Sequence, residues 1–325
     1  MSRAQTLLVV SDIHYAGPAE RLRRDFESRV IRNPFTRLLS RLYRRHIWLA
    51  DPLAHYSKLD QLLREPVQPD FTIALGDYSC DSAFVGVSDE AAFESAQECL
   101  AKLRKRFEPD FVACMGDHEL GKFSLFGQAG GLRLASYKRA VNELGIAPLW
   151  HRRMGRYFLL GVASSLIAYP VFERESLPDE RPDWWKLRAE HLEQIRKVFD
   201  GLDSRQKVLL FCHDPTALPF LAREEAISRR LGQIEKTFIG HLHTRQVMRL
   251  AQKLSGMPVI RCLGNSVRRM SSGLREARYW EQFNLSLCPS PTGIQLLKDG
   301  GYLTVVVDGE GADSIQINFH PLAWQ

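Results

Sequence analysis

The sequence predicts an α/β protein built around a largely parallel sheet. Five short apolar runs of strand length recur along the 325 residues, and stretches with helical spacing of apolar residues lie between them. Continuous apolar runs are typical of strands that are buried on both faces. Each run is followed closely by a short motif that contains Asp or His. Parallel sheets bind ligands at the loops beyond the carboxyl ends of their strands, so the motifs lie where a site is expected.

The five runs are the predicted central strands, because they are rich in β-branched and aliphatic residues. Side chains that are far apart in the sequence would then meet along one edge of the sheet. The predicted strands are Thr6–Val10, Phe71–Leu75, Phe111–Met115, Lys207–Phe211 and Thr237–Ile239.

Three stretches between these strands predict helices, since apolar residues recur at spacings of three and four. Ala91–Arg106 ends before Pro109, and Arg245–Leu254 ends before Gly256. Trp184–Phe199 has the same period. We expect Asp183 to be its N-cap, because a carboxylate accepts the free N–H groups of a first helical turn.

After about residue 280 the pattern changes to short strands separated by turns that contain Pro and Gly. The expected strands are Phe283–Leu287, Tyr302–Val307 and Ser314–Phe319, which favours an antiparallel ending and a second sheet packed on the first. The sequence contains no internal repeat, low-complexity tract or Gly/Ser linker. We therefore predict a single domain over residues 1–325, with an Arg-rich helical insertion at about 16–69 and a β-rich part from about 280.

The composition is ordinary for a globular protein, with 45% hydrophobic and 25% charged residues. No apolar run approaches the ~18 residues that a membrane span needs. The first apolar stretch, Leu7–Val10, is too short for the core of a signal peptide. The six cysteines are scattered without a CxxC pair, which predicts reduced, mostly buried thiols. We expect a cytoplasmic protein.

The five motifs supply three carboxylates and four imidazoles that could hold two metal ions. Hard metals prefer carboxylate oxygen, borderline metals also bind imidazole nitrogen, and two such ions can activate a shared water for attack on phosphorus. In Asp12-x-His14 and His241-x-His243 an extended backbone would point both side chains the same way. Each motif alone also fits a turn or a core histidine, but five in this order favour one shared site. The motifs are Ser11-Asp12-Ile13-His14, Gly76-Asp77, Gly116-Asp117-His118-Glu119, Cys212-His213-Asp214-Pro215 and Gly240-His241-Leu242-His243.

This order of motifs resembles the pattern of the calcineurin-like metallophosphoesterases: D-x-H, G-D, G-N-H-E/D, H and G-H-x-H. The match covers roughly Thr6 to Thr244. The resemblance implies a four-layer α/β/β/α sandwich of two mixed sheets and a pair of divalent or trivalent ions, Mn, Fe or Zn. It also implies that His118 is not a ligand but donates a hydrogen bond to a phosphate oxygen or the leaving group. By the same resemblance Asp12, His14 and His243 would bind the first metal, Asp117, His213 and His241 the second, and Asp77 both.

Asp117 departs from this pattern, because the family usually has Asn there. An Asp still ligates through oxygen, but its charge should tighten metal binding and weaken the attraction of an anionic substrate. Asp214 has two interpretations, as a partner that orients His213 or as the start of the Asp214-Pro215 turn. A second basic group follows Gly264-Asn265-Ser266 and is either a lip of the site or a solvated loop. Its members are Arg268, Arg269, Arg275 and Arg278.

Nine arginines lie between Glu20 and His46 against three acidic residues, an excess that equals the +6 formal charge of the chain. Within Arg29–Leu49, apolar residues recur near helical period with arginines between them. Three interpretations are open: a surface helix whose apolar stripe packs on the core, a cap that brings Arg to a phosphate-rich substrate, or a helix that binds an anionic membrane. The same arginines could contact nucleic acid, but no nucleic-acid-binding motif supports this.

The predicted function is hydrolysis of a phosphomonoester, phosphodiester or pyrophosphate by a hydroxide that bridges two metals. His118 would act as a general acid or electrostatic stabiliser. The expected substrate is a phosphorylated small molecule, lipid-linked or nucleotide. The alternative is a metal-binding or interaction scaffold on the same fold that has lost catalysis, and the complete ligand set argues against it.

Overall fold

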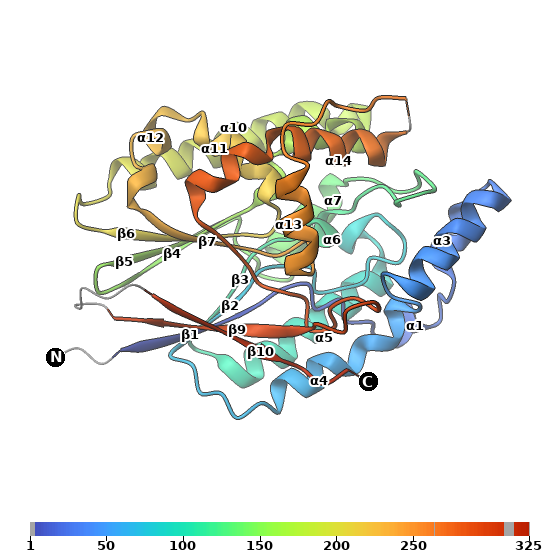
Figure 1. Cartoon of the computed structure of the whole chain (residues 1–325), viewed down its shortest axis with the longest axis horizontal. Helices are drawn as coiled ribbons and strands as arrows, with labels where there is room; N and C mark the ends of the chain where they lie inside the picture. Colours follow the sequence, from blue (N-terminus) through green and yellow to red (C-terminus); the bar gives the residue numbers. More distant parts are fainter. Residues whose placement is uncertain (1–3, 263, 309–314, 325) are drawn as a thin grey trace.

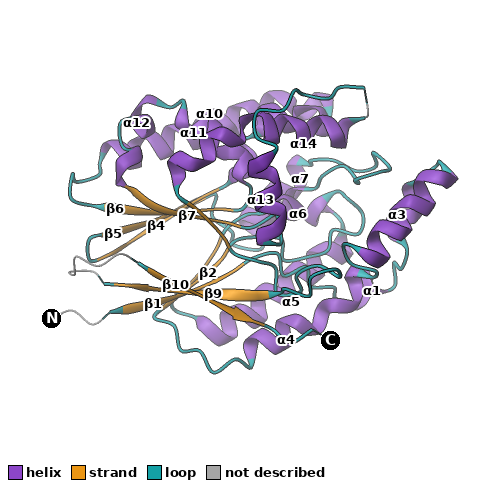
Figure 2. Ribbon diagram, in the orientation of Figure 1, coloured by secondary structure: helices purple, strands orange, loops and turns teal. Residues whose placement is uncertain are grey.

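The computed structural model describes residues 4–262, 264–308 and 315–324. Two five-stranded mixed sheets pack face to face, and helices cover the outer face of each (Figure 1). The colouring by secondary structure in Figure 2 separates these layers, with the strands enclosed between two sets of helices. The four-layer sandwich that the resemblance implied is therefore confirmed.

The first sheet has the strand order β10-β9-β1-β2-β3. Its three N-terminal strands are parallel, and β9 and β10 are antiparallel neighbours. Val10 of β1 pairs with Ala74 of β2, which pairs with Ala113 of β3, so these carboxyl ends are level. The strands are β1 (Gln5–Val10), β2 (Phe71–Ala74), β3 (Phe111–Ala113), β9 (Gly301–Val307) and β10 (Gln316–Pro321).

The second sheet has the order β4-β5-β6-β7-β8, in which β5 to β8 are parallel and β4 is antiparallel. Alternate residues of each central strand face the other sheet or the outer helices. Leu7 and Val9 of β1, for example, join Leu209 and Phe211 of β6 in the core between the sheets. The strands are β4 (Leu149–Met154), β5 (Tyr157–Val162), β6 (Lys207–Cys212), β7 (Ile234–Ile239) and β8 (Leu285–Leu287).

The predicted antiparallel ending is confirmed for β9 and β10 and is wrong for β8. β8 extends the second sheet in parallel, while β9 and β10 complete the first sheet. The hairpin of β4 and β5 was not predicted. β4 carries polar residues at the edge of its sheet, whereas β5 is an apolar run that is buried throughout and was overlooked. Strand composition indicates a pleated, half-buried segment but does not name its neighbour. Ser314 and the Gly309-Glu310-Gly311 turn lie outside the described residues.

The long helices lie close to their predicted positions. α5 (Glu90–Phe107) is one residue longer than predicted at each end, and α13 (Arg245–Lys253) is one residue shorter at its C-terminal end. α10 (Arg181–Asp200) starts before Asp183, so the predicted N-cap is wrong; Pro182 lies in its first turn, where a missing N–H costs nothing. The other α-helices are α1 (Pro18–Arg21), α2 (Phe26–Val30), α3 (Pro34–His46), α4 (Ser57–Leu63), α6 (Asp117–Leu120), α7 (Leu134–Asn142), α8 (Ser164–Ile167), α9 (Tyr169–Phe172), α11 (Leu218–Ala222), α12 (Glu225–Ser228) and α14 (Asn265–Glu276). Short 3₁₀ helices cover Pro52–Tyr56, Gly86–Ser88, Glu173–Glu175, Pro178–Glu180, Pro215–Ala217, Leu231–Gln233 and Ala277–Phe283.

The Arg-rich segment forms α2 and α3, and α3 projects from the end of the sandwich (Figure 1). The side chain of Asn33 caps α3 by accepting the N–H groups of Phe35 and Thr36. The apolar stripe of α3 does not pack on the core, since Phe35 is 67% exposed and Leu38 is 54% exposed. The interpretation of α3 as a helix whose stripe packs on the core is therefore wrong, because the helix extends beyond the sheets that would cover it.

Within the described part of the chain, no helix combines the length and the apolar character that a membrane crossing requires. All six cysteines are free, and five of them are buried while Cys262 is exposed.

Candidate metal centre

The five motifs lie at the carboxyl ends of β1, β2, β3, β6 and β7. Most of their residues are in loops, whereas Asp117, His118 and Glu119 belong to the short helix α6. The predicted position of the motifs is right, but the predicted single edge is wrong. β1 to β3 belong to one sheet and β6 and β7 to the other. The site therefore lies where the carboxyl ends of two packed sheets meet, and each sheet contributes part of it.

Asp12, His14 and His243 form the first cluster of possible metal ligands. Nε2 of His14 lies 3.2 Å from Nε2 of His243. Nε2 of His243 lies 3.5 Å from Oδ1 of Asp12, whose side chain is fully buried. The two histidines come from different sheets, so the fold rather than local sequence brings them together.

Asp77, Asp117, His213 and His241 form the second cluster. Oδ1 of Asp117 lies 3.4 Å from Nε2 of His213 and 3.5 Å from Nδ1 of His241. Oδ2 of Asp77 lies 3.2 Å from Nε2 of His213 and 3.9 Å from Nε2 of His14. Asp77 thus stands between the two clusters.

His118 lies at the edge of this arrangement. Its Nε2 is 3.7 Å from Oδ2 of Asp77, and its ring centroid is 4.5 Å from that of His14. His14, Asp77 and His118 also lie close enough together to hold an ion. The separate role of His118 towards the substrate therefore stays a prediction.

The backbone of the motifs is not extended. Asp12, His14, Asp77, His241 and His243 all have left-handed conformations, with φ between 48° and 61°. We predicted that an extended backbone would point the two side chains of Asp12-x-His14, and those of His241-x-His243, in the same direction. That prediction is therefore wrong. Asp12 and His14 still converge on one cluster, whereas His241 and His243 join different clusters. Non-glycine residues rarely adopt this conformation, and such strain concentrates at functional sites.

Bound cations would balance the buried carboxylates of this cluster. Burial raises the pKa of Asp12, as does the charge of Asp77. Burial lowers the pKa of His213, but Asp77 and Asp12 outweigh it and raise that pKa well above its usual value. Nε2 of His213 and Oδ1 of Asp117 are buried without a hydrogen bond to any described residue. Buried carboxylates and unpaired imidazole nitrogens in this geometry fit a pair of transition-metal ions.

Glu119 was part of a motif, but sequence reasoning gave it no role. Its carboxylate is fully buried and accepts the backbone N–H groups of Gly116, Asp77 and Tyr78 at 2.8 to 3.0 Å. It therefore joins the loop after β2 to the start of α6, which follows β3. The letters G-D-H-E alone cannot reveal this contact, because it joins residues about forty positions apart.

Lys122 and Arg269 are two cationic residues of the site. No pattern in the sequence singled out Lys122, and the role of Arg269 was left open. Nζ of Lys122 lies 3.0 Å from Oδ2 of Asp117, the residue that departs from the family pattern. Although burial raises the pKa of Asp117, Lys122 and His241 hold it well below its usual range. Arg269 lies on α14 and pairs with Glu175 at 3.1 Å. The interpretation of this basic group as a solvated loop is therefore wrong, because Arg268, Arg269 and Arg275 lie on a helix and Arg278 follows it.

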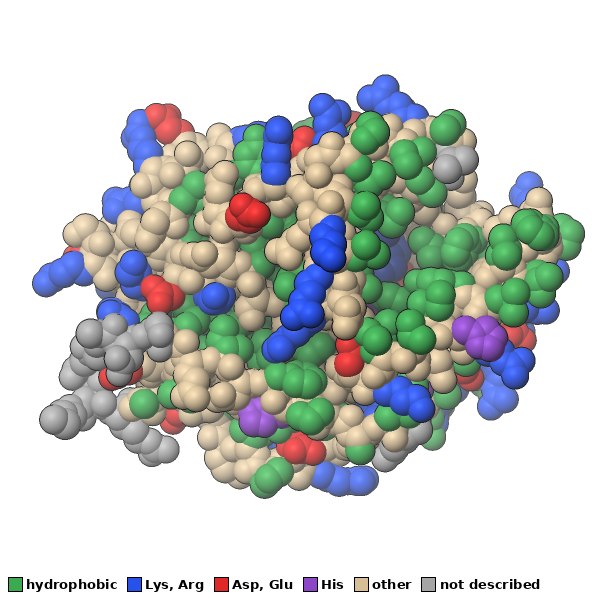
Figure 3. Space-filling model, in the orientation of Figure 1, with side chains coloured by type: hydrophobic (Ala, Val, Ile, Leu, Met, Phe, Trp, Pro, Cys, Tyr) green, Lys and Arg blue, Asp and Glu red, His purple; other side chains and the backbone are tan. Residues whose placement is uncertain are grey.

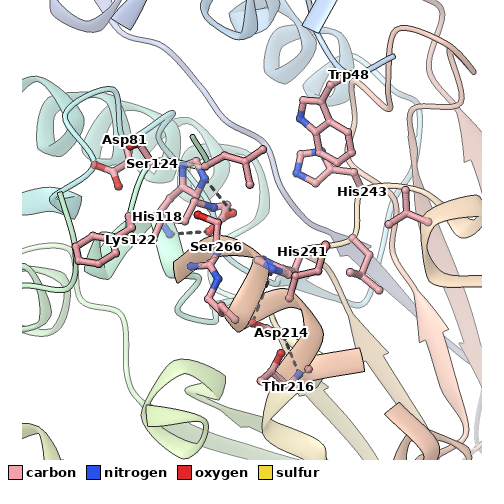
Figure 4. Close-up of a pocket in the computed structure, with 18 of the residues that line it drawn as sticks. Trp48, Asp81, His118, Lys122, Ser124, Asp214, Thr216, His241, His243 and Ser266 are labelled. Carbon is pink, nitrogen blue, oxygen red and sulfur yellow. Dashed lines mark hydrogen bonds and ion pairs between the residues drawn. The ribbon is translucent and has the colours of Figure 1, made fainter. Parts of the chain in front are cut away.

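Asp214 begins a turn, and its Oδ1 accepts the N–H group of Thr216 at 2.8 Å. Its Oδ2 lies 3.8 Å from Nε2 of His241 (Figure 4). The turn interpretation is right, and the histidine that Asp214 approaches is His241 rather than the expected His213. Trp48, from the segment after α3, lies against His243 with ring centroids 4.8 Å apart (Figure 4).

The sequence matches the family model of the calcineurin-like phosphoesterases over residues 5–245. The chain belongs to this family. As a calcineurin-like phosphoesterase it is a metal-dependent hydrolase of phosphoester bonds, and its Asp and His clusters could bind the metals. Family membership favours the hydrolase over the silent scaffold.

A comparison with solved structures finds distant matches, among them the following three. A phosphopantetheinyl hydrolase from Mycobacterium tuberculosis is 17% identical, with a TM-score of 0.36, and the match covers 75% of this chain and 84% of that one. A purple acid phosphatase from yellow lupin (Lupinus luteus) is 12% identical, with a TM-score of 0.40 and coverage of 99% and 52%. The anchor protein of the inner membrane complex of Plasmodium is 10% identical, with a TM-score of 0.39 and coverage of 100% and 90%. A search of curated proteins finds no match.

Proposed function

We propose that this phosphoesterase uses a dinuclear metal centre to hydrolyse a phosphomonoester, phosphodiester or pyrophosphate. The observation that supports this most directly is the position of Asp77 between two Asp/His clusters. Asp12, His14 and His243 would hold the first ion, and Asp117, His213 and His241 the second. Mn, Fe and Zn all accept this mixture of oxygen and nitrogen ligands.

The two ions would lower the pKa of a shared water and offset negative charge on the phosphoryl oxygens during attack. The chain positions the reacting groups by burying Asp12 and Asp77 completely and by tying the Asp77 loop to Glu119. Rigid ligands hold the geometry without reorganisation during the reaction.

His118 would donate a hydrogen bond to a phosphoryl oxygen or to the leaving group. Burial lowers the pKa of His118 well below its usual value, which favours the neutral imidazole. A neutral imidazole still carries one N–H donor. The backbone N–H of His118 donates to Oδ1 of Asp77 at 3.0 Å, which fixes the residue beside the proposed bridging ligand.

Lys122 supports a phosphorylated substrate, since an ammonium group beside the metals attracts an anion. It also balances Asp117, whose charge would otherwise repel that anion. The substrate would be a small phosphorylated molecule, lipid-linked or nucleotide. The free cysteines support work in a reducing compartment, and we propose the cytoplasm. We also propose that residues 1–325 act as a single domain.

Hydrolysis assays with added Mn²⁺, Fe²⁺ or Zn²⁺ test the proposed function. The probes are p-nitrophenyl phosphate, bis-p-nitrophenyl phosphate and p-nitrophenyl phenylphosphonate. Turnover of at least one ester, with two ions bound per chain by elemental analysis, is expected. No turnover with any of these metals, in protein that holds two ions, would favour the scaffold instead.

We further propose that α3 contacts an anionic membrane surface, because exposed apolar side chains lie beside arginines on this helix. Arg37→Glu combined with Arg41→Glu is expected to reduce co-sedimentation with vesicles of anionic lipid. Equal binding of the parent and variant proteins to such vesicles would contradict this proposal.

A further inference from the structure

An apolar cavity opens directly from the metal centre. It encloses about 440 Å³, and His14, Asp77, His118, His241 and His243 form one end of its lining. Ligand pockets of proteins commonly have volumes of about 300–1,000 Å³. The space-filling view shows hydrophobic side chains gathered around a hollow between α3 and α13 (Figure 3).

α13 forms one wall of this cavity. Val247, Leu250 and Leu254 line the wall at spacings of three and four, so they share one face of the helix. Leu250 remains 56% exposed and Leu254 42% exposed. Ala251 lies on the same face and also lines the cavity, but its small side chain is buried. The helix therefore presents an apolar face that the rest of the described chain leaves uncovered.

α14 and the segment around α3 form the other walls. Met270 and Leu274 of α14 line the cavity, and Met270 is 58% exposed. Tyr43 and Trp48 face the space from the α3 side. Trp48 also contacts His243, so the aromatic wall reaches the first metal cluster.

Basic side chains lie near the metal end of the cavity. Lys122 and Arg269 line the cavity at this end. A third cation, Arg44 of α3, lines the cavity from the α3 side and pairs with Glu27. The cavity thus offers cations and metal ligands to a phosphoryl group and apolar side chains to whatever is attached to that group. A nucleotide would expose polar base and sugar atoms to these apolar walls, where unpaired polar groups are costly.

We propose that the cavity binds the aliphatic tail of an amphiphilic phosphoester whose phosphoryl group lies at the metal centre. This inference rests on the proposed function and narrows it to one substrate class. Water would add to phosphorus and one P–O bond would break, with the leaving oxygen taking up the proton. The tail contributes binding by leaving water, by about 0.8 kcal/mol for each buried CH₂ group, which corresponds to up to fourfold in kcat/KM.

p-Nitrophenyl alkyl phosphates with methyl, butyl and octyl chains test the tail site, at concentrations below micelle formation and without detergent. Hydrolysis releases p-nitrophenolate and leaves the alkyl phosphate, so the reacting bond is the same in each probe. We expect kcat/KM to rise from the methyl to the octyl ester by on the order of 100-fold, which corresponds to full burial of about half of the seven added CH₂ groups. A kcat/KM that does not change with chain length would overturn the inference while leaving the phosphoesterase function intact.

Leu250→Asp and Met270→Asp place a charge on two cavity walls, at side chains exposed enough to be replaced without unfolding the core. Each is expected to lower the octyl-to-methyl ratio of kcat/KM at least tenfold. Leu22→Asp is the matched control, because Leu22 is 84% exposed and lies outside the cavity lining. Equal ratios in the parent and both cavity variants would overturn the inference.

Calorimetric binding of methyl phosphate and octyl phosphate separates this inference from the proposed function. If no ester is hydrolysed with any metal, the proposed function fails, and these affinities decide the tail site alone. Tighter binding of octyl phosphate, lost in Leu250→Asp but kept in Leu22→Asp, would support the site. Equal affinity for the two phosphates would overturn it.

Discussion

The carboxylate of Glu119 accepts the backbone N–H group of Asp77, with its Oε2 3.0 Å from the nitrogen. The same oxygen accepts the N–H group of Gly116, and Oε1 accepts that of Tyr78. One buried side chain thus ties the loop that carries Asp77 to the start of α6, where Asp117 lies. Burial and the charge of Asp77 raise the pKa of Glu119 to about 7. The position of the proposed bridging ligand therefore depends on a residue that touches no proposed metal position.

Glu119→Gln tests this dependence. Glutamine has one acceptor oxygen in place of two, so its NH₂ group must face at least one backbone N–H donor. We expect metal affinity to fall by about 10- to 100-fold, the range found when groups that hold metal ligands are changed. Titration of the metal-free protein with Mn²⁺ measures it, and the exposed Glu94→Gln on α5 is the control. Parent-like affinity in Glu119→Gln would show that the loops hold their shape without this carboxylate.

Lys122→Met tests whether the ammonium group of Lys122 balances the negative charge of Asp117. Removal of the ammonium group leaves the charge of Asp117 unbalanced near the substrate, so kcat/KM for an anionic ester should fall by at least about tenfold while both metals remain bound. The double variant Asp117→Asn, Lys122→Met removes both charges and should recover part of this loss. The exposed Lys138→Met on α7 serves as control. Loss of metal from Lys122→Met, or unchanged kcat/KM, would contradict the charge argument.

His118→Ala separates a substrate-facing histidine from a metal ligand. We expect both ions to remain and the rate to fall by about 10²–10⁴-fold, the range of general acid–base catalysis. Asp77→Asn is the comparison, since loss of the proposed bridging carboxylate should lower both metal content and turnover. Elemental analysis and initial rates measure both variants. Collapse of the metal content in His118→Ala would make His118 a ligand, as its distance of 3.7 Å to Asp77 permits.

The strand ends and the α/β class were predictable, because buried central strands leave continuous apolar runs such as Leu7–Val10 in the sequence. The change of pattern after residue 280 indicated a second sheet, but the assignment of strands to the two sheets could not be predicted, since β1 and β6 have similar apolar character and pair in different sheets. The pairing of Arg269 with Glu175 could not be predicted, because the two residues lie 94 positions apart and meet through the fold. Lys122 lies only five residues after Asp117, but no sequence pattern indicated that its side chain turns back to that carboxylate. The exposed stripe of α3 has the same helical pattern as a packed one, so periodicity alone could not show that it is uncovered.

His191 allows a test of pH-dependent stability away from the metal centre. It lies buried on α10, and its Nε2 accepts the N–H group of Ala163 at 3.2 Å. Burial lowers its pKa from 6.5 to about 4. Between these values the unfolded chain binds a proton that the folded chain excludes, so stability falls as the pH drops from 6.5 towards 4. At pH 5 this effect costs about 2 kcal/mol of unfolding free energy relative to neutral pH.

His191→Gln keeps an acceptor for Ala163 and removes the titrating group. We expect the loss of unfolding free energy between pH 7 and pH 5 to be smaller in this variant than in the parent, by about 2 kcal/mol. Urea unfolding at the two pH values measures this difference, because other titrating groups contribute equally to both proteins. His151→Gln, which removes an exposed imidazole, is the control for the change of residue type. Equal pH dependence in the parent and His191→Gln would mean that His191 accepts its proton in the folded protein, with water or a local opening solvating the charge.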